Sequence, residues 1–194
     1  MTDNQPEWEA TTNSAGVNYI PITLENNYHD DRLKLCIDNA KMGDSTNMVI
    51  VSSHIGPHFR EKPSAEYVSF AHRVIDLGGD IYWGHSNHMP QGIEIYKDKL
   101  IMYDCGDFID DYAIEPVYRN DLSFIFLLNI EEGNNRLNYI ELVPTKIRKF
   151  RANTVTSSSS DLSLAINRMV NRCNSLGTQC KIDNGRIKIT CDRH

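Results

Sequence analysis

The chain has 194 residues, 40% of them hydrophobic and 24% charged, which suits one globular domain or one domain with a small appendage. The formal net charge is −6, and Lys and Arg are scattered along the sequence, which argues against a nucleic-acid or anionic-membrane surface. No apolar run is long enough to span a membrane, and the polar, acidic residues 1–16 do not resemble a secretory signal.

The cysteines indicate a reducing compartment. Their number is odd and no pair has C-x-x-C spacing, so free thiols are favoured over disulfides or a zinc site. We therefore expect a cytoplasmic protein. A cell-surface location is the alternative if an anchor precedes this sequence.

The first third of the sequence predicts irregular structure and then regular elements. Residues 1–16 read as an irregular lead, and 17–22 ("VNYIPI") as a short strand. Residues 30–43 have a helical apolar period and begin with the pair Asp30 and Asp31, which suits the positive end of a helix dipole.

A strand, a helix and a strand follow within a short stretch. The β-branched run 47–54 predicts a buried strand, and 80–83 ("DIYW") predicts a second one. Between them, residues 62–79 predict a helix that Ser64 can cap and a Gly-Gly pair ends. This is a βαβ unit, so the two strands should be parallel.

The rest of the chain favours hairpins and one more helix. We expect a hairpin over 92–108, a strand pair over 122–148, a polar connector at 154–160, a helix over 161–177 and a hairpin over 179–191. The fold class is α/β: a layered sheet with β-hairpin extensions and a small C-terminal helix-hairpin. We assign residues 1–156 to the main domain and 157–194 to a cap packed on it.

Two histidines end the strands of the predicted βαβ unit. "VIVSSH" ends at His54 and "DIYWGH" ends at His85, and ligands of open α/β sheets bind outside the carboxyl ends of the strands. If the strands are neighbours, the two imidazoles converge, and His88 lies in the same loop as His85. Because neutral imidazole binds zinc, iron and manganese, these three residues predict a metal site.

The other histidines are weaker candidates. His58 lies in a loop, where it could touch substrate or be solvated. His72 lies within the predicted helix, so we expect it to be packed or half-exposed. His29 and His194 are expected at the surface.

Several aspartates follow the next predicted strand. In "DCGDF", Asp104 and Asp107 could orient the ring of a ligating histidine through a hydrogen bond. Asp110 and Asp111 are expected to be solvated or to cap a turn.

The order of these motifs resembles a known family. The series "VIVSSHIGP" and "AHRVIDLGGDIYWGHSNHMPQGIEIYKDKLIMYDCGDF" resembles the bacterial capsule-synthesis CapA (poly-γ-glutamate synthesis) family of the calcineurin-like metallophosphoesterase superfamily. Its members carry a strand ending in "HWG", then a helix, then "GHxxH", then a "GxExYxGxxIxYxxG(D/N)F" run. Ile55 replaces the family's usual Trp, and the match covers roughly residues 2–150.

The resemblance implies a two-metal site that holds Mn, Zn, Fe or Mg. His54 and His85 would bind one metal and His88 would reach the other, so that two ions clamp a phosphate and activate a water. His54 and His88 are then the catalytic candidates, Asn87 a substrate contact and Asp107 a carboxylate that orients a ligand.

Family members also carry an N-terminal half with acidic motifs and an Asn-His pair, which this sequence lacks. The resemblance therefore implies the C-terminal half of the domain, with an exposed sheet edge or apolar face that pairs with the missing half or drives self-association. A truncation, a split protein and a reduced relative all fit.

The resemblance implies metal-dependent hydrolysis of a phosphoester or related bond in capsule synthesis, with a small molecule or a polymer as substrate. The alternative is a non-catalytic binding module that has lost the two-metal site.

Overall fold

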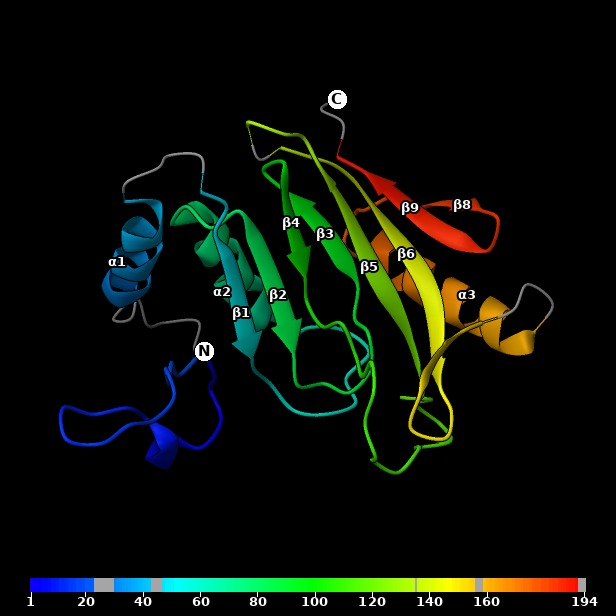
Figure 1. Cartoon of the computed structure of the whole chain (residues 1–194), viewed down its shortest axis with the longest axis horizontal. Helices are drawn as coiled ribbons and strands as arrows, with labels where there is room; N and C mark the ends of the chain where they lie inside the picture. The colour runs from blue at the N-terminus through cyan, green and yellow to red at the C-terminus, as the bar shows by residue number, and fades with distance from the viewer. Residues whose placement is uncertain (23–29, 43–46, 135, 156–158, 192–194) are drawn as a thin grey trace.

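The computed structural model describes residues 1–22, 30–42, 47–134, 136–155 and 159–191. Within these residues the chain forms two β-sheets and three α-helices (Figure 1). This confirms the α/β prediction and is consistent with a layered metallophosphoesterase-like fold. No described helix is long and apolar enough to cross a membrane.

The first sheet carries the predicted βαβ unit. Its strand order is β1-β2-β4-β3, where β1, β2 and β4 are parallel and β3 is antiparallel to β4. The helix α2 connects β1 to β2, as predicted, and α1 precedes β1. The bounds are α1 Asp30–Lys41, β1 Ile50–His54, α2 Ala65–Asp76, β2 Ile81–His85, β3 Ile93–Tyr96 and β4 Lys99–Met102.

The second sheet is antiparallel and contains the C-terminal hairpin. Its order is β5-β6-β9-β8, and the short strand β7 pairs with β6. Because β9 pairs with β6, the C-terminal hairpin extends this sheet, and α3 packs against it. The bounds are β5 Leu122–Ile130, β6 Leu137–Ile147, β7 Ala152–Thr154, α3 Ser160–Asn174, β8 Lys181–Asp183 and β9 Arg186–Thr190.

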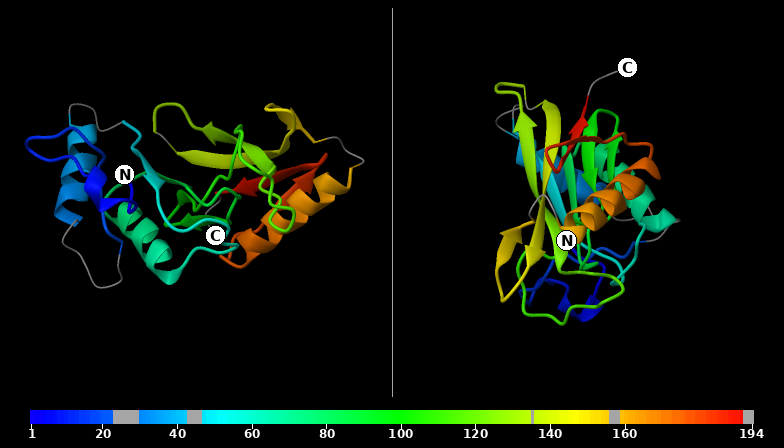
Figure 2. Two further views of the ribbon diagram at one scale, coloured as in Figure 1. Left: turned by 90° about the horizontal axis from the view of Figure 1, so that it is seen from below. Right: turned by 90° about the vertical axis from the view of Figure 1, so that its right-hand side faces the viewer.

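Two apolar clusters hold the layers together. One includes Val51, Tyr82 and Ile101 and packs the first sheet against α1 and α2. The other joins the opposite face of that sheet, through Ile81 and Leu100, to the second sheet and α3. Figure 2 shows α2 on one side of the first sheet and β5 and β6 toward the other. The middle of the first sheet is therefore buried on both faces, which explains its continuous apolar runs.

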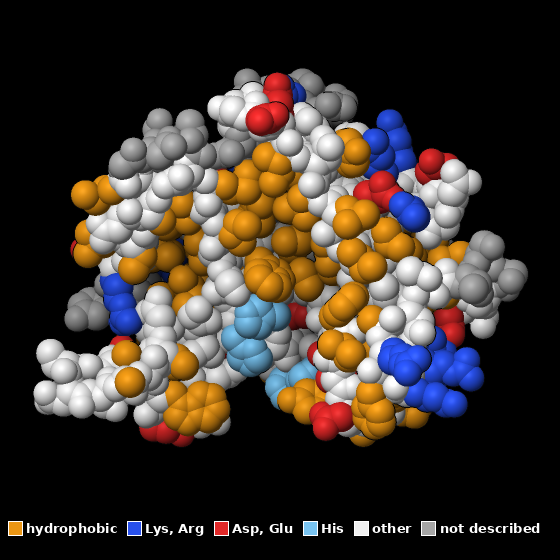
Figure 3. Space-filling model, viewed as in Figure 1, with side chains coloured by type: hydrophobic (Ala, Val, Ile, Leu, Met, Phe, Trp, Pro, Cys, Tyr) orange, Lys and Arg blue, Asp and Glu red, His pale blue; other side chains and the backbone are white. Residues whose placement is uncertain are grey.

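The inter-sheet face continues past its cover at β1 and β2. Ile50 is paired with Ile81, and Trp83 lies two residues after Ile81 on β2, so both share its face of the sheet. Their exposed fractions are nevertheless 52% and 44%. Figure 3 shows hydrophobic side chains exposed across the middle of this side of the molecule. This face is therefore apolar and partly open.

Some local predictions were wrong. Residues 17–22 form no strand, since Val17 and Tyr19 make only isolated bridges to other parts of the N-terminal segment. Pro21, which has no N–H to donate, interrupts this apolar run. The strand β7 and a short 3-10 helix at Pro6–Trp8 were not predicted. His29, His194, Gly43 and residues 156–158, where the predicted domain border falls, lie outside the described residues.

Candidate metal centre

The strand register brings His54 and His85 together. They are directly paired residues of the parallel strands β1 and β2, and their Nδ1 atoms lie 3.0 Å apart. Two nitrogens bound to one metal at about 2.1 Å lie about 3.0 Å apart when the angle between the bonds is near 90°. The contact is a hydrogen bond between the two rings, and its length also equals the separation of neighbouring ligands in octahedral coordination.

Ser52 lies two residues before His54 on β1, and its hydroxyl contacts the ring of His85. Its Oγ lies 3.0 Å from His85 Nε2. The tautomer with the proton on Nε2 donates to this hydroxyl and leaves the Nδ1 lone pair directed toward His54. A hydrogen bond on the far nitrogen that orients the ring is the usual support of a metal-binding histidine.

Partial desolvation favours the neutral state of both imidazoles, which is the state that metals bind, although His54 is exposed at the end of β1. Desolvation lowers the pKa of His54 below its ordinary value of 6.5, nearby His88 and His58 lower it further, and Asp3 opposes them. Desolvation, followed by the neighbouring His54, likewise lowers the pKa of His85. Fewer protons therefore compete with a metal at neutral pH.

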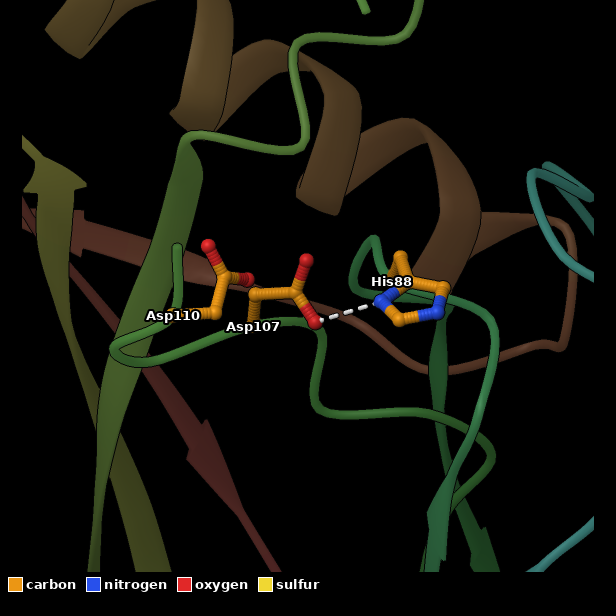
Figure 4. Close-up of side chains that lie close together, drawn as sticks. All are labelled: His88, Asp107 and Asp110. Atoms are coloured by element: carbon orange, nitrogen blue, oxygen red, sulfur yellow. Dashed lines mark hydrogen bonds and ion pairs between the residues drawn. The ribbon is translucent and has the colours of Figure 1, made fainter. Parts of the chain in front are cut away.

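His88 belongs to a second group of side chains, which includes two carboxylates (Figure 4). His88 Nδ1 donates to Asp107 Oδ1 at 2.9 Å, and one potential ligand atom from each of His88, Asp107 and Asp110 lies within 4.8 Å of the others. Sequence analysis expected Asp107 beside a ligand, but it expected Asp110 to be solvated or to cap a turn. Asp110 does cap the following turn, because its Oδ1 accepts the Tyr112 N–H at 3.2 Å, and the structure also places it in this cluster.

The two carboxylates crowd each other. Burial, together with the neighbouring Asp110, raises the pKa of Asp107 to about 6 although His88 opposes the shift. Asp110 Oδ2 is buried and has no hydrogen-bond partner within the described part of the chain. A bound cation would satisfy that oxygen and relieve the repulsion, so these donors suit a divalent metal.

His58 lies beside the second group of side chains, which consists of His88, Asp107 and Asp110 and is called the loop group below. Its ring lies against His88 with centroids 4.5 Å apart, and both rings are close enough to lower the pKa of His54. The strand pair and the loop group therefore share one electrostatic neighbourhood. Figure 3 shows histidine side chains close to one another below the middle of this face.

The loop that carries His88 is held from beneath by Asp104. This carboxylate is 3% exposed and accepts the backbone N–H groups of Asn87, at 2.8 Å, and Gly106, at 2.7 Å. The support fixes His88 in a left-handed backbone conformation with φ +63°. This conformation is uncommon for a residue with a Cβ, although turns such as Lys97–Asp98 adopt it too.

Asn87 lies inside the same loop. Its side chain is hydrogen-bonded to backbone groups of Arg60 and Met89, and the residue is 3% exposed. These bonds use the carbonyl oxygen and both amide hydrogens, so Asn87 holds the loop together. A substrate contact through this side chain stays a prediction and would require these bonds to open.

Gly84 lets the ends of β2 and β4 approach closely. A Cβ at this position would lie 2.0 Å from the carbonyl oxygen of Tyr103. The glycine that precedes His85 therefore places the histidine by permitting close backbone packing.

Asp3 is a neighbour of the site that sequence analysis missed. Its carboxylate accepts the Gly56 N–H at 3.1 Å and the Tyr67 hydroxyl at 3.2 Å, and its charge raises the pKa of His54. The available signal was the segment before the first strand, which resembles the family but contains no recognised ligand motif.

His72 lies outside the centre. It is half-buried on α2, bonds Glu94 at 3.0 Å and stacks on Tyr96, which agrees with the packed position that was expected.

Comparisons with known proteins agree with the motif order. Residues 1–112 match the family described as "Bacterial capsule synthesis protein PGA_cap". The "Probable polyglutamine synthesis accessory protein" of Mycobacterium tuberculosis is 30% identical over 79% of this chain and 40% of its own length.

Two Bacillus proteins also match. The "Capsule biosynthesis protein CapA" of Bacillus anthracis is 27% identical over 59% of this chain and 26% of its own length. The "PGA biosynthesis protein CapA" of Bacillus subtilis is 34% identical over 34% of this chain and 17% of its own length. The chain thus spans at most 40% of the length of these relatives. It belongs to the bacterial capsule synthesis protein PGA_cap family.

Proposed function

We propose that this chain carries one part of a two-metal hydrolytic centre that acts in the synthesis or handling of a poly-γ-glutamate capsule. His54 and His85 would bind one divalent metal, and His88, supported by Asp107, would bind the other. The observation that carries this proposal is the 3.0 Å spacing of the His54 and His85 Nδ1 atoms at the ends of paired parallel strands.

The side chains of the chain would have separate tasks. Ser52 would hold the ring of His85, and Asp107 would accept the Nδ1 proton of His88 so that Nε2 keeps its lone pair for a ligand. Asp110 would contribute negative charge that offsets the charge of a cation. Imidazole together with carboxylate favours Mn, Zn or Fe over Mg, which prefers oxygen ligands.

Bound metals would polarise a phosphoryl or related group and lower the pKa of a water for attack on it. Hydrolysis of a phosphoester or related bond is the reaction class that such a centre supports. The names of the relatives point to capsule biosynthesis and PGA biosynthesis as the process in which it works.

The bridging carboxylate and the remaining ligands would come from a part of the relatives that this chain does not span, or from a second copy of the chain. The exposed side chains of Ile50 and Trp83 support such pairing. The strand β1 is an edge strand of the first sheet, next to the candidate metal centre. Beside its outer edge lie Met1 and Thr2, and among the described residues this edge has no other strand partner.

Equilibrium dialysis or calorimetry with Mn²⁺ or Zn²⁺ tests the centre. We expect stoichiometric binding at the His54–His85 site that His85→Ala abolishes and His72→Ala leaves intact, because His72 is a histidine outside the centre. If the wild-type chain binds no metal at sub-millimolar concentrations, the metal centre is refuted and the non-catalytic binding module is favoured.

A further inference from the structure

A cationic turn joins β6 to β7. Arg148 and Arg151 exchange backbone hydrogen bonds of 2.9 and 3.2 Å across it, and Lys149 and Phe150 between them have φ values of +51° and +58°. These left-handed conformations carry strain, and the side chains of all four residues are exposed, with Phe150 70% exposed. The turn therefore holds three cations and an aromatic ring in solvent.

A hollow of about 420 Å³ lies beside this turn. Arg148, Lys149 and Phe150 line one side of it, and Tyr112 and Asp110 lie on another. Because Asp110 is also part of the cluster with His88 and Asp107, the hollow borders the candidate metal centre. Its volume is within the range of ordinary ligand sites.

The cations around the hollow are of two kinds. Arg119 and Lys146 form ion pairs with Asp121 and Asp161, so these four charges balance one another. Arg148, Lys149 and Arg151 form no ion pair with any described residue. The turn is thus locally positive in a chain whose net charge is −6. Figure 3 shows positively charged side chains gathered at the lower right, where β6 ends in Figure 1.

We propose that this hollow and the Arg148–Arg151 turn bind an extended polymer whose repeating unit bears carboxylates, and guide it toward His88. The inference rests on the proposed function in one respect only, which is that the polymer is hydrolysed near His88. The guanidinium of Arg148 and the ammonium of Lys149 would pair with successive carboxylates, while Phe150 and Tyr112 would contact the methylene groups between them.

The charge distribution of the protein favours a polycarboxylate over a nucleic acid as the bound polymer. A duplex presents a dense row of phosphates and requires a wide basic surface, whereas the basic turn here is small and the whole chain is acidic. Spaced charges that alternate with apolar contacts suit a flexible polycarboxylate.

The test is fluorescence anisotropy of a short labelled poly-γ-glutamate oligomer with the full chain, in EDTA and at low ionic strength. We expect saturable binding that weakens as salt is added, and that becomes about tenfold weaker in the double variant Arg148→Ser/Lys149→Ser. The control, Arg136→Ser/Lys181→Ser, removes the same two exposed charge types from the far end of the second sheet and should bind like wild type. Circular dichroism verifies that both variants fold.

Metal-free conditions separate this inference from the proposed function. Oligomer binding that survives His85→Ala supports the turn whatever the metal measurements show. The inference is overturned if the wild-type chain does not bind, if the two double variants lose affinity equally, or if linear polyphosphate binds more tightly than the oligomer.

Discussion

The two parts of the candidate metal centre are built in different ways. His54 and His85 lie on paired strands, so the backbone ladder of β1 and β2 sets their separation. His88, Asp107 and Asp110 lie on two loops, where hydrogen bonds from side chains to the backbone, chiefly those of Asp104 and Asn87, set their positions. The strand part therefore depends on sheet packing, and the loop part depends on a buried polar network.

This difference predicts how each part fails. A ladder of backbone hydrogen bonds forms with the sheet itself, so the strand part should be lost only when the sheet is distorted. A polar network tolerates substitutions poorly because each lost partner leaves a buried group unsatisfied. Single polar substitutions should therefore disturb the loop part while the strand part survives.

Gly84→Ala should give the largest effect, because it breaks the strand part. Its Cβ would lie 2.0 Å from the Tyr103 carbonyl oxygen, so β2 and β4 must move apart. We expect a loss of about 3 kcal/mol or more in the free energy of unfolding, together with loss of metal binding. Urea denaturation and calorimetry measure both.

The control for this variant is Gly133→Ala, at a turn where a Cβ meets nothing within 4 Å. Its positive φ alone should cost about 1 kcal/mol, and metal binding should persist. Wild-type stability and metal affinity in Gly84→Ala would contradict the assignment of a packing role to this glycine.

Asp107→Asn should disturb the loop part and spare the strand part. The amide oxygen can still accept the His88 Nδ1 proton, but the negative charge is lost, so affinity at the His88 site should fall about 10- to 100-fold. Calorimetry should show one weakened site beside one unchanged site.

Asp111→Asn is the matched control, since Asp111 is an exposed carboxylate outside the cluster. An equal loss in both variants would mean that the effect comes from general charge. No loss in Asp107→Asn would remove Asp107 from the centre.

The strand part of the centre could be predicted from the sequence, whereas the loop part could be predicted only incompletely. Apolar runs bounded by glycines gave β1, α2 and β2, and parallel strand ends then implied that His54 and His85 converge. The turn cap by Asp110 was predicted, but its approach to His88 was not, because that approach depends on the folding of loops, which leaves no periodic pattern. The error at residues 17–22 has a similar cause, since alternation alone cannot show whether a partner strand is present.

Acid–base behaviour should give the smallest effect, with opposite signs in the two parts. In the metal-free protein, folding lowers the pKa of His54 and His85 and raises that of Asp107 to about 6. The unfolded chain therefore binds more protons at the histidines below pH 6.5. The folded chain binds more at Asp107, between the ordinary value of 3.8 and about 6.

Urea denaturation in EDTA at a series of pH values measures this difference. The difference in the free energy of unfolding between wild type and His54→Gln/His85→Gln should be largest above pH 6.5. It should shrink as the pH falls, because the histidines of the unfolded chain become protonated at a higher pH than those of the folded chain. Relative to Asp107→Asn, the wild-type advantage should be greatest below pH 3.8 and decline as the pH rises through about 6. Taking differences between variants cancels the other titrating groups, including buried Asp104. If both stability differences changed with pH in the same direction, the strand and loop parts would not differ in their electrostatic environment.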